Sequence, residues 1–162
     1  MQLAQLNVAE SLYPVDDPRM IGFTGRIDVI NALAERAPGF IWRLVDDNEE
    51  IDGALDLRLP GSETTLVNMS VWENVESLYH FVYKTAHAKV MKDRKDWFVT
   101  PTEQFMVLWW VADDHQPDRD EARAKLDYLR ENGPTPDAFT FQIPFDETGN
   151  PITPNFPKKD CA

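Results

Sequence analysis

The stretch TLVNMSVW, residues 65–72, decides the fold, because it alternates like a β-strand and runs directly into a long helical segment. One face of such a strand is apolar and consists of Val67, Met69 and Val71. The opposite face includes two polar groups and an indole, and its members are Leu66, Asn68, Ser70 and Trp72. This mixed face predicts the lining of a cavity, and we expect the cavity to be enclosed.

Residues 73–98 contain no glycine or proline, so we expect a helix of several turns there, with room for one break. Its core stripe consists of Val75, Leu78, Val82, Ala86 and Val90. A second stripe lies beside it and consists of Tyr79, Tyr83, His87 and Met91. Any chemistry is therefore expected around Asn68, Trp72 and the second stripe. If Asn68 proves solvent-exposed, or if its face is filled solid with side chains, the enzyme interpretation fails and a dimeric structural module takes its place.

The chain has 162 residues, which suits one domain with a sizeable core. Its 28 acidic and 16 basic residues give a net charge of −12, which argues against nucleic acid or an anionic membrane as the main partner. No apolar run is long enough for a transmembrane helix, and the first residues lack a signal-peptide pattern. The single cysteine, Cys161, can form no internal disulfide. We therefore expect a cytoplasmic protein.

Further strands are predicted for residues 2–9, 40–45 and 104–111, and helices for residues 19–36 and 118–132. In the second strand, Phe40 and Trp42 would share one face, and Arg43 would point into the interior from the other. Trp109 and Trp110 are adjacent and would therefore lie on opposite faces of the last strand. Residues 46–62 are interpreted as an acidic solvated hairpin, because Leu59 stands where a calcium loop requires glutamate.

The order strand–helix–strand, strand–helix–strand predicts an α+β protein with the ferredoxin-like split βαβ arrangement. We expect one domain over residues 1–145, with an extra C-terminal helix and an extended arm, and then a proline-rich tail over residues 146–162. The sheet face away from the crossover helices is also apolar, and a second copy of the sheet is its simplest cover. This predicts a homodimer with a barrel-like interior. The arm at 139–145 is expected to pack on its own body or on a second subunit.

Motifs along most of the chain resemble those of one known family. They are AQLNV at 4–8, DVINALA at 28–34, PGFIWRL at 38–44, NMSVWE at 68–73, FVYKTAHAKVM at 81–91, WF at 97–98, VLWWV at 107–111, GPTP at 133–136 and AFTF at 138–141. Over roughly residues 3–145 the chain resembles the DUF3291 family, within the dimeric α/β-barrel superfamily that includes antibiotic-biosynthesis monooxygenases.

The resemblance implies a monooxygenase-like or cyclase-like enzyme of secondary metabolism that acts on a hydrophobic, aromatic or polyketide-like metabolite without a bound cofactor or metal. In the cofactor-free quinone-forming oxygenases of the superfamily, an Asn and a Trp four residues later stand at the end of the third strand. Asn68 and Trp72 match that spacing. An Arg and a Tyr from the next helix accompany them in those enzymes, and Arg94 and Tyr79 or Tyr83 are the candidates here.

We therefore expect catalytic roles for Asn68, Trp72, Tyr83 and His87, with the histidine or the tyrosine as the base. The residues expected to contact the substrate are Arg43, Tyr79, Met91, Arg94 and Trp109.

Two other functions fit the same residues. A haem-binding protein would use His87 or His115 as its axial ligand, and a non-catalytic homodimer would only bind a small ligand. The candidates also have structural interpretations: Trp72 as core, Asn68 as a hydrogen-bond partner of a neighbouring strand, and His87 as a satisfied or surface histidine.

Overall fold

The computed structural model describes residues 1–45 and 62–153, and its centre is a four-stranded antiparallel sheet. The strands are β1 (Gln2–Glu10), β2 (Phe40–Arg43), β3 (Thr65–Trp72) and β4 (Met106–Val111), in the spatial order β2-β3-β1-β4. A 3₁₀ turn (Pro18–Met20) and α1 (Ile21–Glu35) connect β1 to β2. Helices α2 (Val75–Lys84) and α3 (His87–Asp93), with a 3₁₀ turn (Arg94–Asp96), connect β3 to β4. The predicted α+β ferredoxin-like topology is confirmed.

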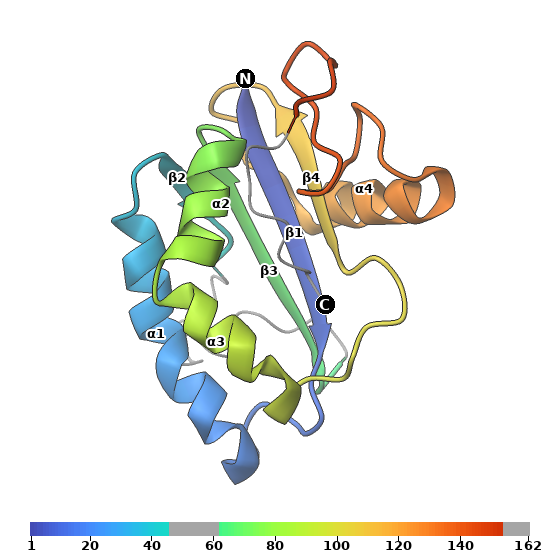
Figure 1. Ribbon diagram of the computed structural model, residues 1–162. Coiled ribbons are helices and arrows are strands. Elements are labelled where there is room, and N and C mark those ends of the chain that lie inside the picture. The colour runs from blue at the N-terminus through green and yellow to red at the C-terminus, as the bar shows by residue number, and fades with distance from the viewer. Residues whose placement is uncertain (46–61, 154–162) are drawn as a thin grey trace.

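Helices cover both faces of the sheet. Helices α1, α2 and α3 lie on one face, which we call the inner face, and α4 (Arg119–Asn132) lies on the other, the outer face (Figure 1). The alternation predicted for β3 places its side chains on the two faces in turn. Trp72 packs with α2 on the inner face, whereas Val67, Met69 and Val71 pack with α4 on the outer face. Asp118 fixes the start of α4, since its Oδ1 accepts a hydrogen bond from the Glu121 backbone N–H at 2.8 Å.

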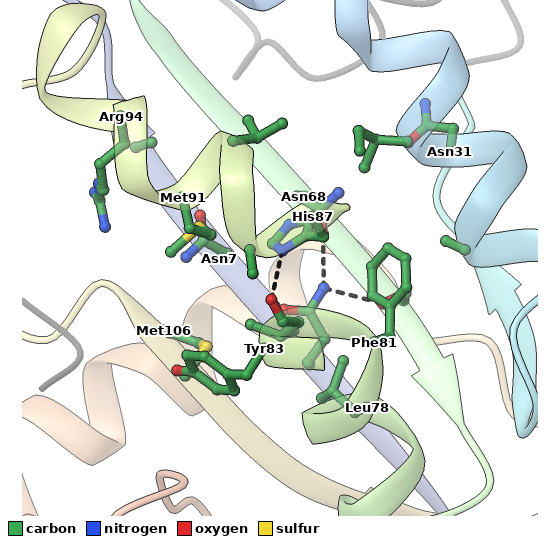
Figure 2. Close-up of a pocket in the computed structure, with 18 of the residues that line it drawn as sticks. Asn7, Asn31, Asn68, Leu78, Phe81, Tyr83, His87, Met91, Arg94 and Met106 are labelled. Atoms are coloured by element: carbon green, nitrogen blue, oxygen red, sulfur yellow. Dashed lines mark hydrogen bonds between the residues drawn. The ribbon is translucent and has the colours of Figure 1, made fainter. Parts of the chain in front are cut away.

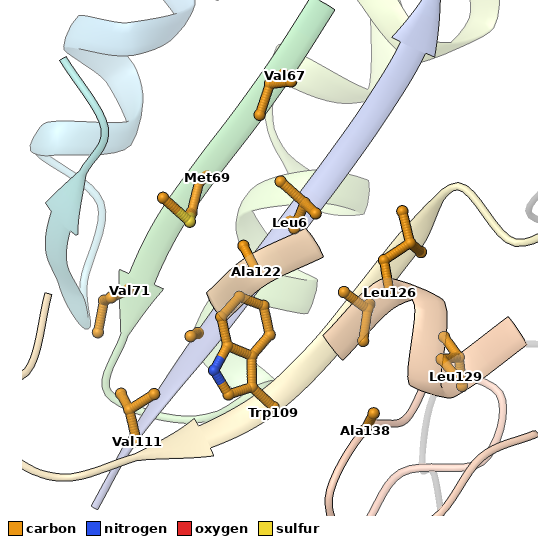
Figure 3. Close-up of a cluster of buried hydrophobic side chains, with 12 residues drawn as sticks. Leu6, Val67, Met69, Val71, Trp109, Val111, Ala122, Leu126, Leu129 and Ala138 are labelled. Atoms are coloured by element: carbon orange, nitrogen blue, oxygen red, sulfur yellow. The ribbon is translucent and has the colours of Figure 1, made fainter. Parts of the chain in front are cut away.

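The outer face is already buried within one chain. Leu6 of β1 and Trp109 of β4 pack against α4 through Ala122, Leu126 and Leu129 (Figure 3). The predicted contacts of this helix are confirmed. A second copy of the sheet is therefore not needed as the cover, which removes the reason given above for a homodimer, and the dimer itself stays a prediction.

The long helix predicted over residues 73–98 is broken. Thr85 is extended, and its Oγ1 donates to the Phe81 carbonyl at 2.6 Å and accepts from the His87 N–H at 3.3 Å, which separates α2 from α3. The predicted core stripe is wrong beyond Leu78, because Phe81 is buried and stacks on Trp72 whereas Val82 is only partly buried. Phe81 precedes the break and lies three residues after Leu78 in α2, so it belongs to the buried side of that helix, whereas the predicted stripe continues through Val82.

The β2 strand departs from simple alternation. Its pairing with β3 shifts between Phe40 and Trp42, so Phe40 packs on the inner face and Trp42 on the outer face. The prediction that they share a face is wrong for this reason. Gly39 precedes the strand with a φ of 79°, and a Cβ there would collide with the Ser77 side chain.

The C-terminal arm packs on its own body. Phe139 and Leu108 of β4 exchange backbone hydrogen bonds of 2.8 and 2.9 Å, and Phe139 and Phe141 are buried in the inner-face core. Residues 146–153 continue as a turn whose Ile152 packs on the same core. Residues 46–61 of the predicted acidic hairpin (46–62) and residues 154–162 of the predicted tail lie outside the described residues. No helix in the described ranges is long and apolar enough to cross a membrane.

The packing of α4 predicts that substitutions on its buried side lower the free energy of unfolding much more than substitutions on its exposed side. Leu126→Ala should lower the free energy of unfolding by about 2–5 kcal/mol, because Leu126 is buried against the outer face. Tyr128→Ala, on the exposed side of the same helix, should change it by less than about 1 kcal/mol. Urea unfolding of both variants measures this difference, and equal losses would contradict the assignment of α4 as the cover.

Candidate functional site

The inner face of the sheet is apolar at its two ends and polar between them. Leu3 and Trp72 belong to a core with α2 and the C-terminal arm, whereas Leu66 belongs to a separate core with α1 and Trp97. Between these cores, β1 and β3 present polar side chains in adjacent register positions. We call them the polar strip, and they are Gln5, Asn7, Asn68 and Ser70.

A cavity of about 660 Å³ lies between this face and helices α1, α2 and α3, and it opens to solvent (Figure 2). Its wall is mostly apolar, with the polar strip on the sheet side. The structure brings eight of the nine predicted site residues to this one cavity. They are Arg43, Asn68, Trp72, Tyr79, Tyr83, His87, Met91 and Arg94.

The polar strip is held by hydrogen bonds between β1 and β3. The Gln5 Nε2 group donates to Asn68 Oδ1 at 2.6 Å and to Ser70 Oγ at 3.0 Å. Ser70 Oγ also accepts from the Trp72 indole N–H at 2.8 Å. Because Asn68 Oδ1 is engaged, the Nδ2 group of Asn68 is the end of the amide left to donate to a ligand, and it has no partner among the described residues.

Asn68 is exposed, and the expectation of an enclosed cavity is wrong, because the cavity opens to solvent. This exposure is the outcome stated above as contradicting an enzyme. The residue nevertheless lies on a central strand beneath the helices, and its neighbours Met69 and Leu66 are buried. The exposed surface of Asn68 faces the cavity (Figure 2). An amide at the bottom of an open cavity remains accessible to a ligand.

Trp72 belongs to the cavity wall but exposes only 1% of its surface. Phe81 stacks on its ring at 5.2 Å between centroids, and Phe40 meets it edge-on at 5.3 Å. The core interpretation of Trp72 is therefore the one that the packing supports. Its indole N–H orients Ser70, so Trp72 can act on a ligand through the polar strip and not by direct stacking.

His87 begins α3, immediately after the break, and its half-buried ring lines the cavity. Its Nδ1 lies 3.2 Å from the Val82 carbonyl, which can only accept, so Nδ1 carries the proton and Nε2 the lone pair. Burial lowers the pKa of His87 below 6.5, and the hydrogen bond to Val82 offsets part of that change. The imidazole is therefore neutral near pH 7, as a general base must be.

The two tyrosines of the second stripe lie together. The rings of Tyr79 and Tyr83 are 4.6 Å apart, and both meet Phe141 of the arm at 5.7 Å. Tyr79 is buried and Tyr83 is half-buried at the cavity (Figure 2). The C-terminal arm thus positions the pair, a contact that helix spacing alone did not predict.

The two predicted arginines have different surroundings. Arg43 Nε donates to Glu35 Oε1 at 2.7 Å, so its charge is compensated at the cavity edge. Arg94 is half-buried and has its guanidinium 4.8 Å from the Phe105 ring centroid. No carboxylate in the described ranges forms an ion pair with Arg94.

The prediction that Trp109 contacts a substrate is wrong. Its side chain lies on the outer face, is fully buried by α4 and donates through Nε1 to Glu121 Oε1 at 2.9 Å. The adjacent Trp110 lies on the inner face, as the alternation of the last strand predicted.

Gln5 and Asn7 are site residues that sequence reasoning missed. Both follow from the alternation of β1, which places them on the same face as Leu3, opposite Ser70 and Asn68 of the neighbouring strand. Recognising them required the pairing of β1 with β3, which the ferredoxin-like topology supplies.

Neither His87 nor His115, the two predicted haem ligands, belongs to a metal cluster. The described part of the chain has no group of three or more His, Cys, Asp or Glu residues placed to hold a metal ion. His115 does not line the cavity, and its Nε2 lies 2.6 Å from Glu121 Oε2 on the surface of α4. A haem in the cavity could therefore use only His87 among the two predicted axial ligands.

The lowered pKa of His87 predicts a stability change with pH. The unfolded chain takes up this proton near pH 6.5 and the folded chain only at lower pH, so the free energy of unfolding falls as the pH drops below 6.5. His87→Gln should reduce the stability lost between pH 7.5 and 5.5, whereas His80→Gln, at an exposed position of α2, should not. Urea unfolding at both pH values measures this, and equal losses in wild type and His87→Gln would contradict a buried neutral imidazole.

Comparison with known proteins gives a family and one distant structural likeness. SnoaB, described as a cofactor-independent oxygenase from Streptomyces nogalater, superimposes with a TM-score of 0.48 at 14% identity, over 72% of this chain and 98% of that one. Comparison with curated proteins gives no match. The family model described as "Domain of unknown function (DUF3291)" matches residues 2–153, the range that contains both the sheet and the cavity. The chain therefore belongs to the DUF3291 family.

Proposed function

We propose that the chain is an enzyme that binds a hydrophobic aromatic metabolite in the inner-face cavity and removes a proton from it without a bound cofactor. The observation that carries the proposal is that two groups lie in the wall of one cavity. They are a neutral His87 with its lone pair on Nε2, and the Asn68 amide N–H groups, which have no acceptor among the described residues. A base and a hydrogen-bond donor are the two groups that abstraction of a proton next to a carbonyl requires.

Each residue has a definite task in this proposal. Asn68 Nδ2 donates to the substrate oxygen and stabilises the negative charge that develops there, while Gln5 fixes the orientation of the amide. His87 takes the proton, a role worth about 10²–10⁴-fold in rate. Tyr83 and Met91 form the apolar walls around the ring. The deprotonated substrate then reacts with oxygen or closes a ring, as the matching Asn68–Trp72 spacing suggests.

Anthrone is a suitable probe, because loss of its acidic proton and reaction with one O₂ gives anthraquinone and water. Asn68→Ala should lower the rate of quinone formation by about 10²-fold, the usual loss for one oxyanion-stabilising donor. His87→Gln should lower it at least as much, and His80→Gln should leave it unchanged. Quinone absorbance and oxygen uptake are the measurements. Wild-type protein no faster than buffer, or an Asn68→Ala variant as fast as wild type, would contradict the proposal.

Haem binding is the second candidate, and the tautomer of His87 favours it. A ligating histidine usually donates its other ring N–H to a carbonyl, as Nδ1 does to Val82. Haem would supply redox chemistry in the cavity, and His87 would be its axial ligand. The visible spectrum of the purified protein separates this candidate from the first. A non-catalytic ligand-binding protein, the third candidate, would bind anthrone without oxidising it.

We also propose that the chain is a cytoplasmic homodimer. Several apolar side chains are exposed on α1 and β2, including Ile21, Val29 and Ile41, with exposed fractions of 73%, 68% and 39%. Burial of these apolar side chains against a second copy would favour association. Light scattering should give twice the mass of the chain at micromolar concentration, and a monomer mass would contradict the dimer.

A further inference from the structure

The cavity has the opposite charge to the rest of the chain. The chain carries 28 acidic and 16 basic residues, yet the described residues that line the cavity include six Lys or Arg and no Asp or Glu. The six are Arg26, Arg43, Lys84, Lys92, Arg94 and Lys95. A local concentration of cations in an acidic protein attracts anions to the cavity and repels cations from it.

These six cations are not equivalent, because two already have carboxylate partners. Arg26 Nη1 lies 3.3 Å from Asp93 Oδ2, and Arg43 Nε lies 2.7 Å from Glu35 Oε1. Arg94 has only the Phe105 ring as a partner in the described ranges, although it is half-buried. Burial lowers the pKa of Arg94, which reflects the cost of holding this charge away from water. An anion beside the guanidinium would offset that cost.

Arg94 also stands at a useful distance from the proposed base. His87 begins α3 and Arg94 follows its last residue, so roughly 10 Å of helix separates them along the axis. Figure 2 shows Met91 between Arg94 and His87 on the cavity side of this helix. A fused-ring ligand could place one end at Asn68 and His87 and the other end at Arg94.

We propose that the ligand is an aromatic compound with an anionic group, a carboxylate or a phenolate, and that Arg94 binds this group. The inference rests on the proposed function, since it names the class of ligand for the same cavity. Lys92 and Lys95 are exposed at the cavity and draw the anion in without forming fixed contacts. Arg94 is a binding residue here, and the reacting atoms lie at the other end of the ligand.

Two fluorescent probes with the same ring system distinguish the effect of an anionic group on the ligand from the binding of the rings in the cavity. Anilinonaphthalene sulfonate is anionic, and phenylnaphthylamine is its neutral counterpart. The sulfonate should bind at least tenfold more tightly than the amine at low salt, because it adds a charge-assisted contact. Raising the salt concentration should weaken binding of the sulfonate and leave binding of the amine unchanged.

Variants assign the effect to Arg94. Arg94→Gln should weaken binding of the sulfonate about tenfold and leave binding of the neutral amine unchanged. Arg94→Lys should restore part of the lost affinity. Arg123→Gln is the matched control, since Arg123 is exposed on α4, on the other side of the sheet. Ala88→Trp, which places an indole in the cavity, should abolish binding of both probes, with circular dichroism to verify its fold.

The outcomes separate this inference from the proposed function. If the neutral amine binds in the cavity and the sulfonate gains nothing from Arg94, the anionic ligand is overturned while the proposed cavity site stands. If neither probe binds, or if Ala88→Trp still binds both, the aromatic-ligand function and the anionic class are overturned together.

Discussion

The hydrogen bonds that Gln5 makes to Asn68 and Ser70 are the interaction on which the rest of the site depends. They satisfy polar groups on a sheet face that apolar side chains would otherwise cover. Because these groups bond to one another across β1 and β3, no helix residue is needed to satisfy them. The helices instead pack on the apolar ends of the inner face and leave a cavity between two cores.

The two faces of the sheet therefore have different tasks. The outer face packs against α4 without polar interruption and holds the fold together, and Trp109 belongs to it. On the inner face, Thr85 breaks the long helical connection and places His87 at the start of a new helix above the polar strip. Phe81, whose carbonyl accepts the Thr85 hydrogen bond, stacks on Trp72 and forms the aromatic wall beside the break.

Local patterns were sufficient for most of the fold. Strict alternation over residues 65–72 predicted which face carries Asn68, and the order of elements predicted the ferredoxin-like topology. The errors have identifiable physical causes. A shift in pairing moved Trp42 to the outer face, Phe81 occupied the buried side of α2 by stacking on Trp72, and α4 covered the surface assigned to a second copy. Each of these outcomes depends on contacts that form only in the folded chain. The charge of the cavity does too, since its six cations come from α1, β2, α2, α3 and the 3₁₀ turn at Arg94–Asp96.

Nuclear magnetic resonance offers the most direct test that the inner-face cavity is the ligand site, because the two faces of the sheet each carry a buried indole. Trp72 donates its N–H to Ser70 beside the cavity, and Trp109 donates its N–H to Glu121 beneath α4. On titration with naphthoic acid, the Trp72 indole and the Asn68 side-chain amide signals should shift while the Trp109 indole signal stays in place. A shift of Trp109 with Trp72 and Asn68 unmoved, or no shift of any of the three, would contradict the account.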